Sequence, residues 1–246
     1  MSSMFSKISD ANLLAFKNNS RQAEVVAKKQ EIVDSISTFH NLTPTTVLYV
    51  GFSSFVFAKF ADKIYITNIG KEVQDYLTKQ NINFEYIADS EIHKYHKAFQ
   101  VVVAVDEYFT HATDDQDQKD TVAEICDLAQ DIVITTLRDY KNQDYKDREF
   151  SQPSLIRSST DSMIFLESHV WNQKERARWD SMIYAITNST NSLTTFGPFD
   201  RHTMYFKQLA NFSASAGATD FLVHKNLMYK GLVKKNYEHV ITIKFD

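Results

Sequence analysis

The sequence predicts an α/β fold: a doubly wound, mainly parallel sheet of about seven strands with an antiparallel last strand, in three α/β/α layers. Short apolar runs alternate with amphipathic segments between about residues 45 and 137, which is typical of strand–helix–strand units with a parallel sheet. The runs are continuously apolar, as expected for strands covered on both faces. The 246 residues, 43% of them apolar, suffice for a large core.

The first 40 residues predict a helical extension that precedes the sheet. Apolar side chains recur at helical spacing over residues 11–40, with Lys, Gln and Glu between them. Pro44 then ends the pattern, because the residue before a proline avoids the helical region. We therefore divide the chain into an extension over 1–40 and a main domain over 41–246.

Five buried strands are predicted in the first half of the main domain. The clearest is FQVVVAV at 99–105, which is rich in β-branched residues. The intervening segments at 55–60, 71–79 and 119–131 are expected to be helical or to form helical turns. The five predicted strands are Val47–Val50, Ile64–Thr67, Phe84–Ile87, Phe99–Val105 and Ile132–Leu137.

The second half has a different character. Residues 139–162 are strongly polar and predict a loop or short helix, whereas 163–171 and 179–187 predict an antiparallel hairpin inserted into the domain. The Ser/Thr/Asn-rich segment 188–197 is expected to be a connection. A helix over 203–216 follows, with Gly217 as its C-terminal left-handed residue, and two strands near 221–223 and 240–245 close the fold.

Composition narrows the classes of function. Lys and Arg number 27 and Asp and Glu 31, a net charge of −4, which gives no global attraction to nucleic acid or anionic membranes. A local basic segment near the end (Lys225, Lys230, Lys234 and Lys235) keeps an RNA contact open. No signal sequence or apolar run long enough to span a membrane is visible, and Cys126 is the one cysteine, so we expect a cytoplasmic, disulfide-free protein with a buried thiol.

The order of elements resembles the class I S-adenosylmethionine-dependent methyltransferase family over roughly residues 35–246. The resemblance rests on VLYVGFSSF at 47–55, FQVVVAVDEYFTH at 99–111, DIVITTL at 131–137 and the late segment DRHTMYFKQLANFSASAGA at 200–218, followed by two strands. The first motif is degenerate, and neither GxGxxG nor a P-loop is present. The resemblance implies a Rossmann-like sheet, S-adenosylmethionine as cofactor and a substrate-side insertion at about 139–200.

The resemblance also implies cofactor-binding residues at the carboxyl ends of the strands. Gly51 and Ser53 fall in the turn after the first strand, where close approach of the ligand favours small residues. Asn68 stands after the second strand, where the family usually has a carboxylate for the ribose hydroxyls. Asp89 follows the third strand at a position that meets the adenine, and Asp106 follows the fourth.

Catalytic and acceptor-binding residues are harder to assign. Asp106 and His111 are candidates for proton transfer, since imidazole titrates near neutrality; each also fits a capping role. Trp171, Arg178 and Trp179 cluster in the hairpin, where they would either line the acceptor pocket or pack on the sheet edge. The histidines show no metal-ligand spacing.

The sequence thus favours a methyltransferase that transfers a methyl group to N or O of an unidentified small or macromolecular acceptor. Two alternatives remain open. Asn68 and the bulky Phe55 favour an inactive scaffold that kept the fold and binds a protein partner, and the basic segment favours an RNA-associated methyltransferase.

Overall fold

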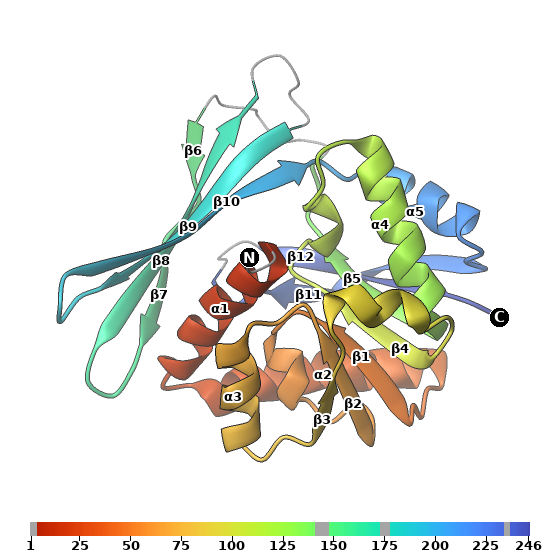
Figure 1. The fold of residues 1–246 in the computed structure, drawn as a ribbon, viewed down its shortest axis with the longest axis horizontal. Helices are drawn as coiled ribbons and strands as arrows, with labels where there is room; N and C mark the ends of the chain where they lie inside the picture. Colours follow the sequence, from red (N-terminus) through yellow and green to blue (C-terminus); the bar gives the residue numbers. More distant parts are fainter. Residues whose placement is uncertain (1–3, 141–147, 173–177, 234–236) are drawn as a thin grey trace.

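The computed structural model describes residues 4–140, 148–172, 178–233 and 237–246. Two sheets organise it (Figure 1): a seven-stranded sheet with helices on both faces, and a smaller antiparallel sheet beside it. The main sheet has the order β11-β12-β5-β4-β1-β2-β3. Its strands are β1 (Thr46–Val50), β2 (Lys63–Thr67), β3 (Phe84–Tyr86), β4 (Phe99–Ala104), β5 (Ala129–Leu137), β11 (Asp220–Lys230) and β12 (Tyr237–Lys244).

The pairing confirms the predicted fold class. β3, β2, β1, β4 and β5 are parallel neighbours, and β12 joins antiparallel to both β5 and β11. The sheet order reverses between β1 and β4, and open α/β sheets bind ligands at such a point, beyond the carboxyl ends of the strands.

Alternate residues of each central strand supply two separate cores. Val47 and Tyr49 of β1 face the core shared with α1 (Met4–Lys17), α2 (Gln22–His40) and α3 (Lys71–Lys79). Leu48 and Val50 face the core shared with α4 (Asp115–Leu128) and α5 (Phe206–Ser215). The central strands β1, β4 and β5 are therefore buried on both faces, which explains why their sequences are continuous apolar runs. Cys126 is buried in the second core, as predicted.

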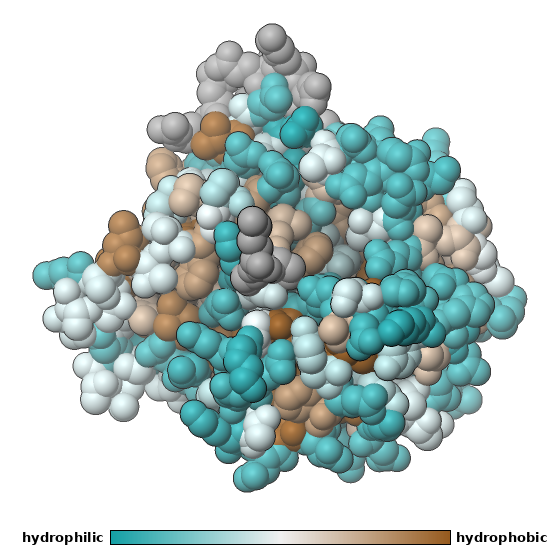
Figure 2. All heavy atoms as spheres, viewed as in Figure 1, coloured by the Kyte–Doolittle hydropathy of each residue, from teal (hydrophilic) through white to brown (hydrophobic). Residues whose placement is uncertain are grey.

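The second sheet contains the predicted hairpin and more. β8 (Ser162–Trp171) and β9 (Arg178–Thr187) pair antiparallel, which confirms the hairpin. β10 (Ser192–His202) adds to β9, while β6 (Arg148–Phe150) and β7 (Ser154–Arg157) add to β8. Figure 2 shows hydrophilic residues over α4 and a mixed, partly apolar surface over this sheet, where Leu155, Ile186 and Leu193 are exposed.

Several predicted elements are corrected. The loop or short helix expected over 139–162 contains strands β6 and β7, because its short alternating runs find partners on β8. The connection expected at 188–197 is largely strand β10, whose residues 192–196 continue the ladder to β9. The expected helix at 55–60 is a single 3-10 turn, η1 (Ser54–Phe57). Gly217 ends α5 at a φ of +90°, as predicted.

The helix expected over 119–131 is displaced: α4 ends at Leu128 and β5 already begins at Ala129, which pairs with Phe99. Two further 3-10 turns follow the strands, η2 (Asp89–Lys94) and η3 (Tyr108–Thr110). No helix among the described residues is long and apolar enough to cross a membrane.

Candidate functional site

The turn after β1 forms one wall of the candidate site. Gly51 adopts a φ of +79°, in the left-handed region that favours glycine, and its N–H donates to the Thr67 carbonyl at 2.9 Å. Ser53 is buried and caps η1, accepting a hydrogen bond from the Phe55 N–H. The Phe55 ring stacks on Tyr229, with centroids 5.6 Å apart, and does not line the space above Gly51. The bulky residue that makes the first motif degenerate is therefore a core residue.

Asn68 and Asp89 lie together at the ends of β2 and β3. Asp89 Oδ1 accepts from the Asn68 N–H at 3.0 Å and from the Thr67 hydroxyl at 3.4 Å. With its nitrogen facing the carboxylate, the Asn68 side chain donates to both Asp89 oxygens at 2.9 and 3.0 Å and accepts from the Tyr108 hydroxyl at 3.3 Å. Since Gly51 also bonds to Thr67, the structure brings Gly51, Asn68 and Asp89 to one edge of the sheet.

Asp106 and Glu107 follow β4 and point in different directions. Both have a positive φ, 64° and 57°, a backbone strain that costs about 1 kcal/mol or more per residue. Asp106 Oδ2 accepts from Asn12 Nδ2 at 3.3 Å. Glu107 pairs instead with Arg138 at 3.3 Å and accepts a hydrogen bond from the Tyr140 hydroxyl. The tight turn thus separates two adjacent carboxylates into two environments.

His111 lies at the same edge and is buried. Its ring makes edge contacts with Phe5 of α1, at 5.5 Å between centroids, and with Phe199 of β10, at 6.3 Å. Tyr108, three residues earlier, stacks on Phe5 at 4.5 Å. Burial raises the pKa of Tyr108 well above its usual range. Tyr108 therefore stays protonated near neutral pH, and Asp106 and His111 are the other two titratable side chains among the described residues that line the slot.

Helix α1 covers the slot above the β1 turn with polar side chains. Ser9 Oγ accepts from the Phe52 N–H at 3.0 Å and donates to the Asn68 carbonyl at 3.1 Å. Asn12 Nδ2 donates to the Phe52 carbonyl at 3.1 Å as well as to Asp106. Figure 1 shows α1 lying across this edge of the main sheet.

The slot beneath α1 is almost closed. Its remaining cavity is about 20 Å³, room for about one water molecule, which needs about 10–15 Å³ on this measure. The cavity is lined by residues of α1, of the β1 turn and of the segment after β4: Phe5, Ile8, Ser9, Asn12, Val50, Gly51, Phe52, Ser53, Val105, Asp106, Tyr108 and His111. With α1 in this position, the slot is too small for a nucleoside.

The three predicted acceptor-side residues lie in the second sheet. Trp171 of β8 and Trp179 of β9 are paired in register, both buried, with ring centroids 4.5 Å apart. Trp179 also lies 5.6 Å from the Tyr140 ring. Arg178 precedes Trp179 at the start of β9 and is half-buried. The tryptophan pair packs against the core beneath α4 and α5, beside the Glu107–Arg138 pair.

A buried charged cluster, which the sequence analysis missed, connects the second sheet to the turn η3 that follows β4. Glu167 of β8 lies 3.6 Å from Arg201 and 3.4 Å from His169. Arg201 also donates to the Thr110 hydroxyl at 2.9 Å and to Ser181 at 3.2 Å. The available signal was a charged residue at an inward position of an otherwise apolar strand, such as Glu167 in SMIFLESHVW. Ser9 and Asn12 gave no signal, because a polar residue on a helix normally faces solvent.

Among the described residues, no three His, Cys, Asp or Glu side chains come close enough to hold a metal ion. Lys225 and Lys230 of the basic segment are exposed on β11. Lys234 and Lys235 lie outside the described residues.

Comparison with known proteins places this geometry in a fold family. No family model and no curated protein matches the sequence. Solved structures do match. DesVI from Streptomyces venezuelae has a TM-score of 0.65 at 9% identity, over 91% of this chain and 92% of its own.

Two further matches cover most of both chains. The S-adenosylmethionine-bound amino pentose methyltransferase CalS10 from Micromonospora echinaspora has a TM-score of 0.63 at 9% identity, over 97% of each chain. The sugar N-methyltransferase KedS8 from Streptoalloteichus has a TM-score of 0.64 at 7% identity, over 89% of this chain and 87% of its own. With its sheet order, its antiparallel last strand and these matches, the chain has the fold of the class I S-adenosylmethionine-dependent methyltransferases.

Proposed function

We propose that the protein is an S-adenosylmethionine-dependent methyltransferase that acts on a nitrogen or oxygen nucleophile, and that α1 must leave the strand ends before the cofactor binds. One observation carries the proposal. The Phe52 N–H and carbonyl, the Asn68 carbonyl and the Asp106 carboxylate converge on a single slot, and polar side chains of α1 meet them there. These are the groups a nucleoside or amino-acid ligand would use in place of α1.

The residues at the slot fit the cofactor once α1 is displaced. Gly51 leaves the backbone accessible, and the Phe52 N–H becomes a free donor for the ligand's carboxylate. Asp89 can accept from an amino or hydroxyl group if its bonds to the Asn68 side chain open. Asn68 accepts less strongly than the usual carboxylate, so we expect weaker binding of the ribose.

The bound cofactor would supply an electrophilic methyl group. The protein's contribution is alignment and proton handling. Asp106 and His111 line the slot on the side where the second sheet begins, His111 being in contact with Phe199 of β10. We assign them to orienting the acceptor and taking its proton. A nitrogen acceptor also agrees with the sugar N-methyltransferase among the structural matches.

The first experiment measures binding of S-adenosylmethionine to the full chain by calorimetry and by thermal unfolding. At a ligand concentration one hundred times Kd, mass action stabilises a binder by about 2.7 kcal/mol, which corresponds to a rise of roughly 5–10 °C in Tm for a domain of this size. Asp89→Ala should abolish the rise. If Asp89→Ala leaves the rise intact, the assignment of the binding site is wrong.

A scaffold without activity is the second candidate, and the closed slot favours it. A variant with a weakened α1 contact distinguishes the methyltransferase from the scaffold. A methyltransferase should bind the cofactor more tightly when α1 is loosened, whereas a scaffold should not bind it in either form. The RNA-associated alternative predicts binding of labelled RNA that weakens between low and moderate salt.

A further inference from the structure

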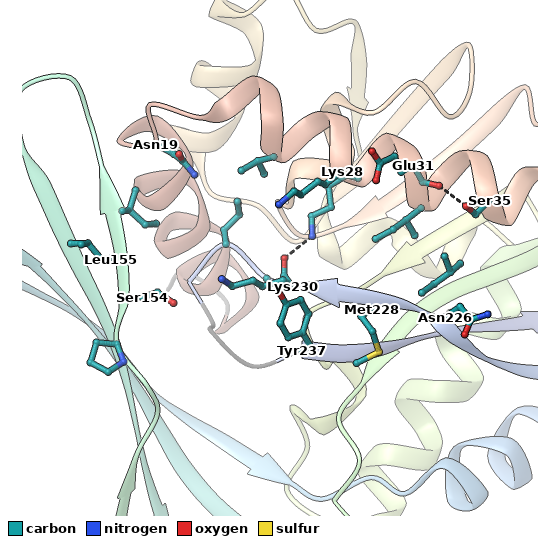
Figure 3. Close-up of a pocket in the computed structure, with 18 residues that line it drawn as sticks. Asn19, Lys28, Glu31, Ser35, Ser154, Leu155, Asn226, Met228, Lys230 and Tyr237 are labelled. Carbon is teal, nitrogen blue, oxygen red and sulfur yellow. Dashed lines mark hydrogen bonds between the residues drawn. The ribbon is translucent and has the colours of Figure 1, made fainter.

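A groove separate from the slot opens between α2, β7 and the end of β11. Its volume is about 740 Å³, within the range of about 300–1,000 Å³ that is usual for small-molecule sites. Figure 3 shows Lys28 and Lys230 on opposite walls, with Leu155 on β7 and Met228 and Tyr237 on the strands. The other lining residues are Asn19, Val25, Lys29, Glu31, Ile32, Ser35, Pro153, Ser154, Ile156, Asn226, Leu227, Gly231 and Leu232.

Lys29 forms the inner wall of the groove and is buried, with 5% of its surface exposed. Its Nζ donates to the Lys230 carbonyl at 2.6 Å and lies 3.6 Å from the centre of the Tyr229 ring. The buried carboxylates of Asp106 and Glu238 act on its charge and favour the protonated form. Burial lowers the pKa of Lys29 to about 8, so the ammonium is still mostly protonated at neutral pH.

The groove is positively charged, although the chain is acidic. Among the described residues, three lysines line it (Lys28, Lys29 and Lys230) and one carboxylate, Glu31, so their formal charges sum to 3 − 1 = +2 against −4 for the whole chain. Lys28 and Lys230 are exposed. Their ammonium groups can therefore reach a ligand in the groove without losing an internal partner.

The same groove exposes apolar side chains. Leu155 is 52%, Met228 39% and Tyr237 58% exposed, and all three line it. Cations on one side and exposed apolar groups on the other suit a ligand with an anionic head and an apolar body.

The groove is distinct from the cofactor slot. The Tyr229 ring and the Asp106 carboxylate lie between the two, since Lys29 sits over Tyr229 on one side and Asn12 bonds to Asp106 on the other. Asp106 also acts on the Tyr229 hydroxyl, whose pKa it helps to raise. Occupation of the groove therefore does not require α1 to move.

We propose that this groove is a binding site for an organic anion that carries a phosphate or carboxylate on an aromatic or aliphatic body. The head group lies against Lys28, Lys29 and Lys230, and the body lies against Leu155, Met228 and Tyr237. The site is independent of the proposed methyl transfer.

Titration calorimetry of the full chain with phenyl phosphate tests the proposal. Phenyl phosphate should bind more tightly than inorganic phosphate, which lacks the body, and more tightly than phenol, which lacks the charge. Benzoate in place of phenyl phosphate distinguishes a carboxylate site from a phosphate site. If neither phenyl phosphate nor benzoate binds at millimolar concentration, or if inorganic phosphate binds as tightly as both, the proposal is overturned.

Substitutions of the lining residues test whether phenyl phosphate binds in this groove. The double substitution Lys28→Gln with Lys230→Gln removes two exposed charges and should weaken binding at least about tenfold, because hydrogen bonds to charged groups are the stronger class. Leu155→Ser should reduce the advantage of phenyl phosphate over inorganic phosphate. Lys207→Gln, an exposed lysine on α5, is the matched control and should bind as the wild type does. Undiminished binding by the double variant would place the anion elsewhere and refute the site.

Discussion

Removing the Ser9 hydroxyl should have opposite effects on stability and on cofactor affinity. Ser9 Oγ makes two hydrogen bonds to the strand ends, at 3.0 Å to the Phe52 N–H and 3.1 Å to the Asn68 carbonyl. At about 1 kcal/mol net for each bond, Ser9→Ala weakens the docking of α1 by about 2 kcal/mol. The free energy of unfolding should fall by up to this amount.

The same change should strengthen binding of S-adenosylmethionine. If α1 and the ligand compete for the slot, the apparent Kd is the intrinsic Kd divided by the fraction of molecules with α1 displaced. A loss of about 2 kcal/mol in docking raises that fraction by up to about thirtyfold. Calorimetry measures the affinity, and urea unfolding without ligand measures the stability.

Ser215→Ala is the matched control, because its hydroxyl bonds within α5 to the Asn211 carbonyl at 2.9 Å. It should leave both quantities near the wild-type values. The competition argument fails if Ser9→Ala lowers stability while the affinity stays unchanged or falls. A fall in affinity would mean that α1 contributes to the cofactor site instead of competing for it.

Three further predictions concern other parts of the fold. Burial lowers the pKa of His40 and of His224, so the folded state binds fewer protons than the unfolded chain, and stability should fall as pH drops below about 6.5. The difference between the urea midpoints at pH 7.5 and 5.5 should therefore be smaller in His224→Gln than in the wild type, and an unchanged difference would contradict this. Burial raises the pKa of the Cys126 thiol to about 12, so a thiol-specific reagent should react only as fast as the protein unfolds in urea, and rapid labelling of the native protein would contradict the burial. Gly197→Ala should lower the unfolding free energy by about 2 kcal/mol, because φ is +119° and the new Cβ would lie 2.9 Å from the Ser181 carbonyl; a urea midpoint equal to that of the wild type would show that the turn relaxes without cost.

The sheet could be predicted from the sequence because its strands are buried on both faces. A run such as FQVVVAV at 99–105 needs no partner to be recognised. β6, β7 and β10 could not be recognised in this way. Their residues are polar or exposed on one side, and they become strands only through pairing with β8 and β9.

The candidate site could likewise be predicted only in part. Gly51, Asn68, Asp89 and Asp106 each follow a predicted strand, and the topology of a parallel sheet brings such positions to one edge. The position of α1 over them could not be predicted, since Ser9 and Asn12 lie 43 and 40 residues from their partner Phe52, in a helix whose position is set by tertiary packing. The positive φ values of Asp106 and Glu107, which turn the two adjacent carboxylates apart, gave no signal in the sequence.

The contacts of Phe5 have a kinetic consequence. Through His111, this one ring of α1 connects the ends of the parallel strands to Phe199 on the second sheet. Any displacement of α1 that exposes the strand ends also removes Phe5 from His111. The methyl donor and the methyl acceptor would therefore reach their sites after the same movement. For the proposed methyl transfer we therefore expect initial-rate patterns of random order, because one movement of α1 exposes both sites.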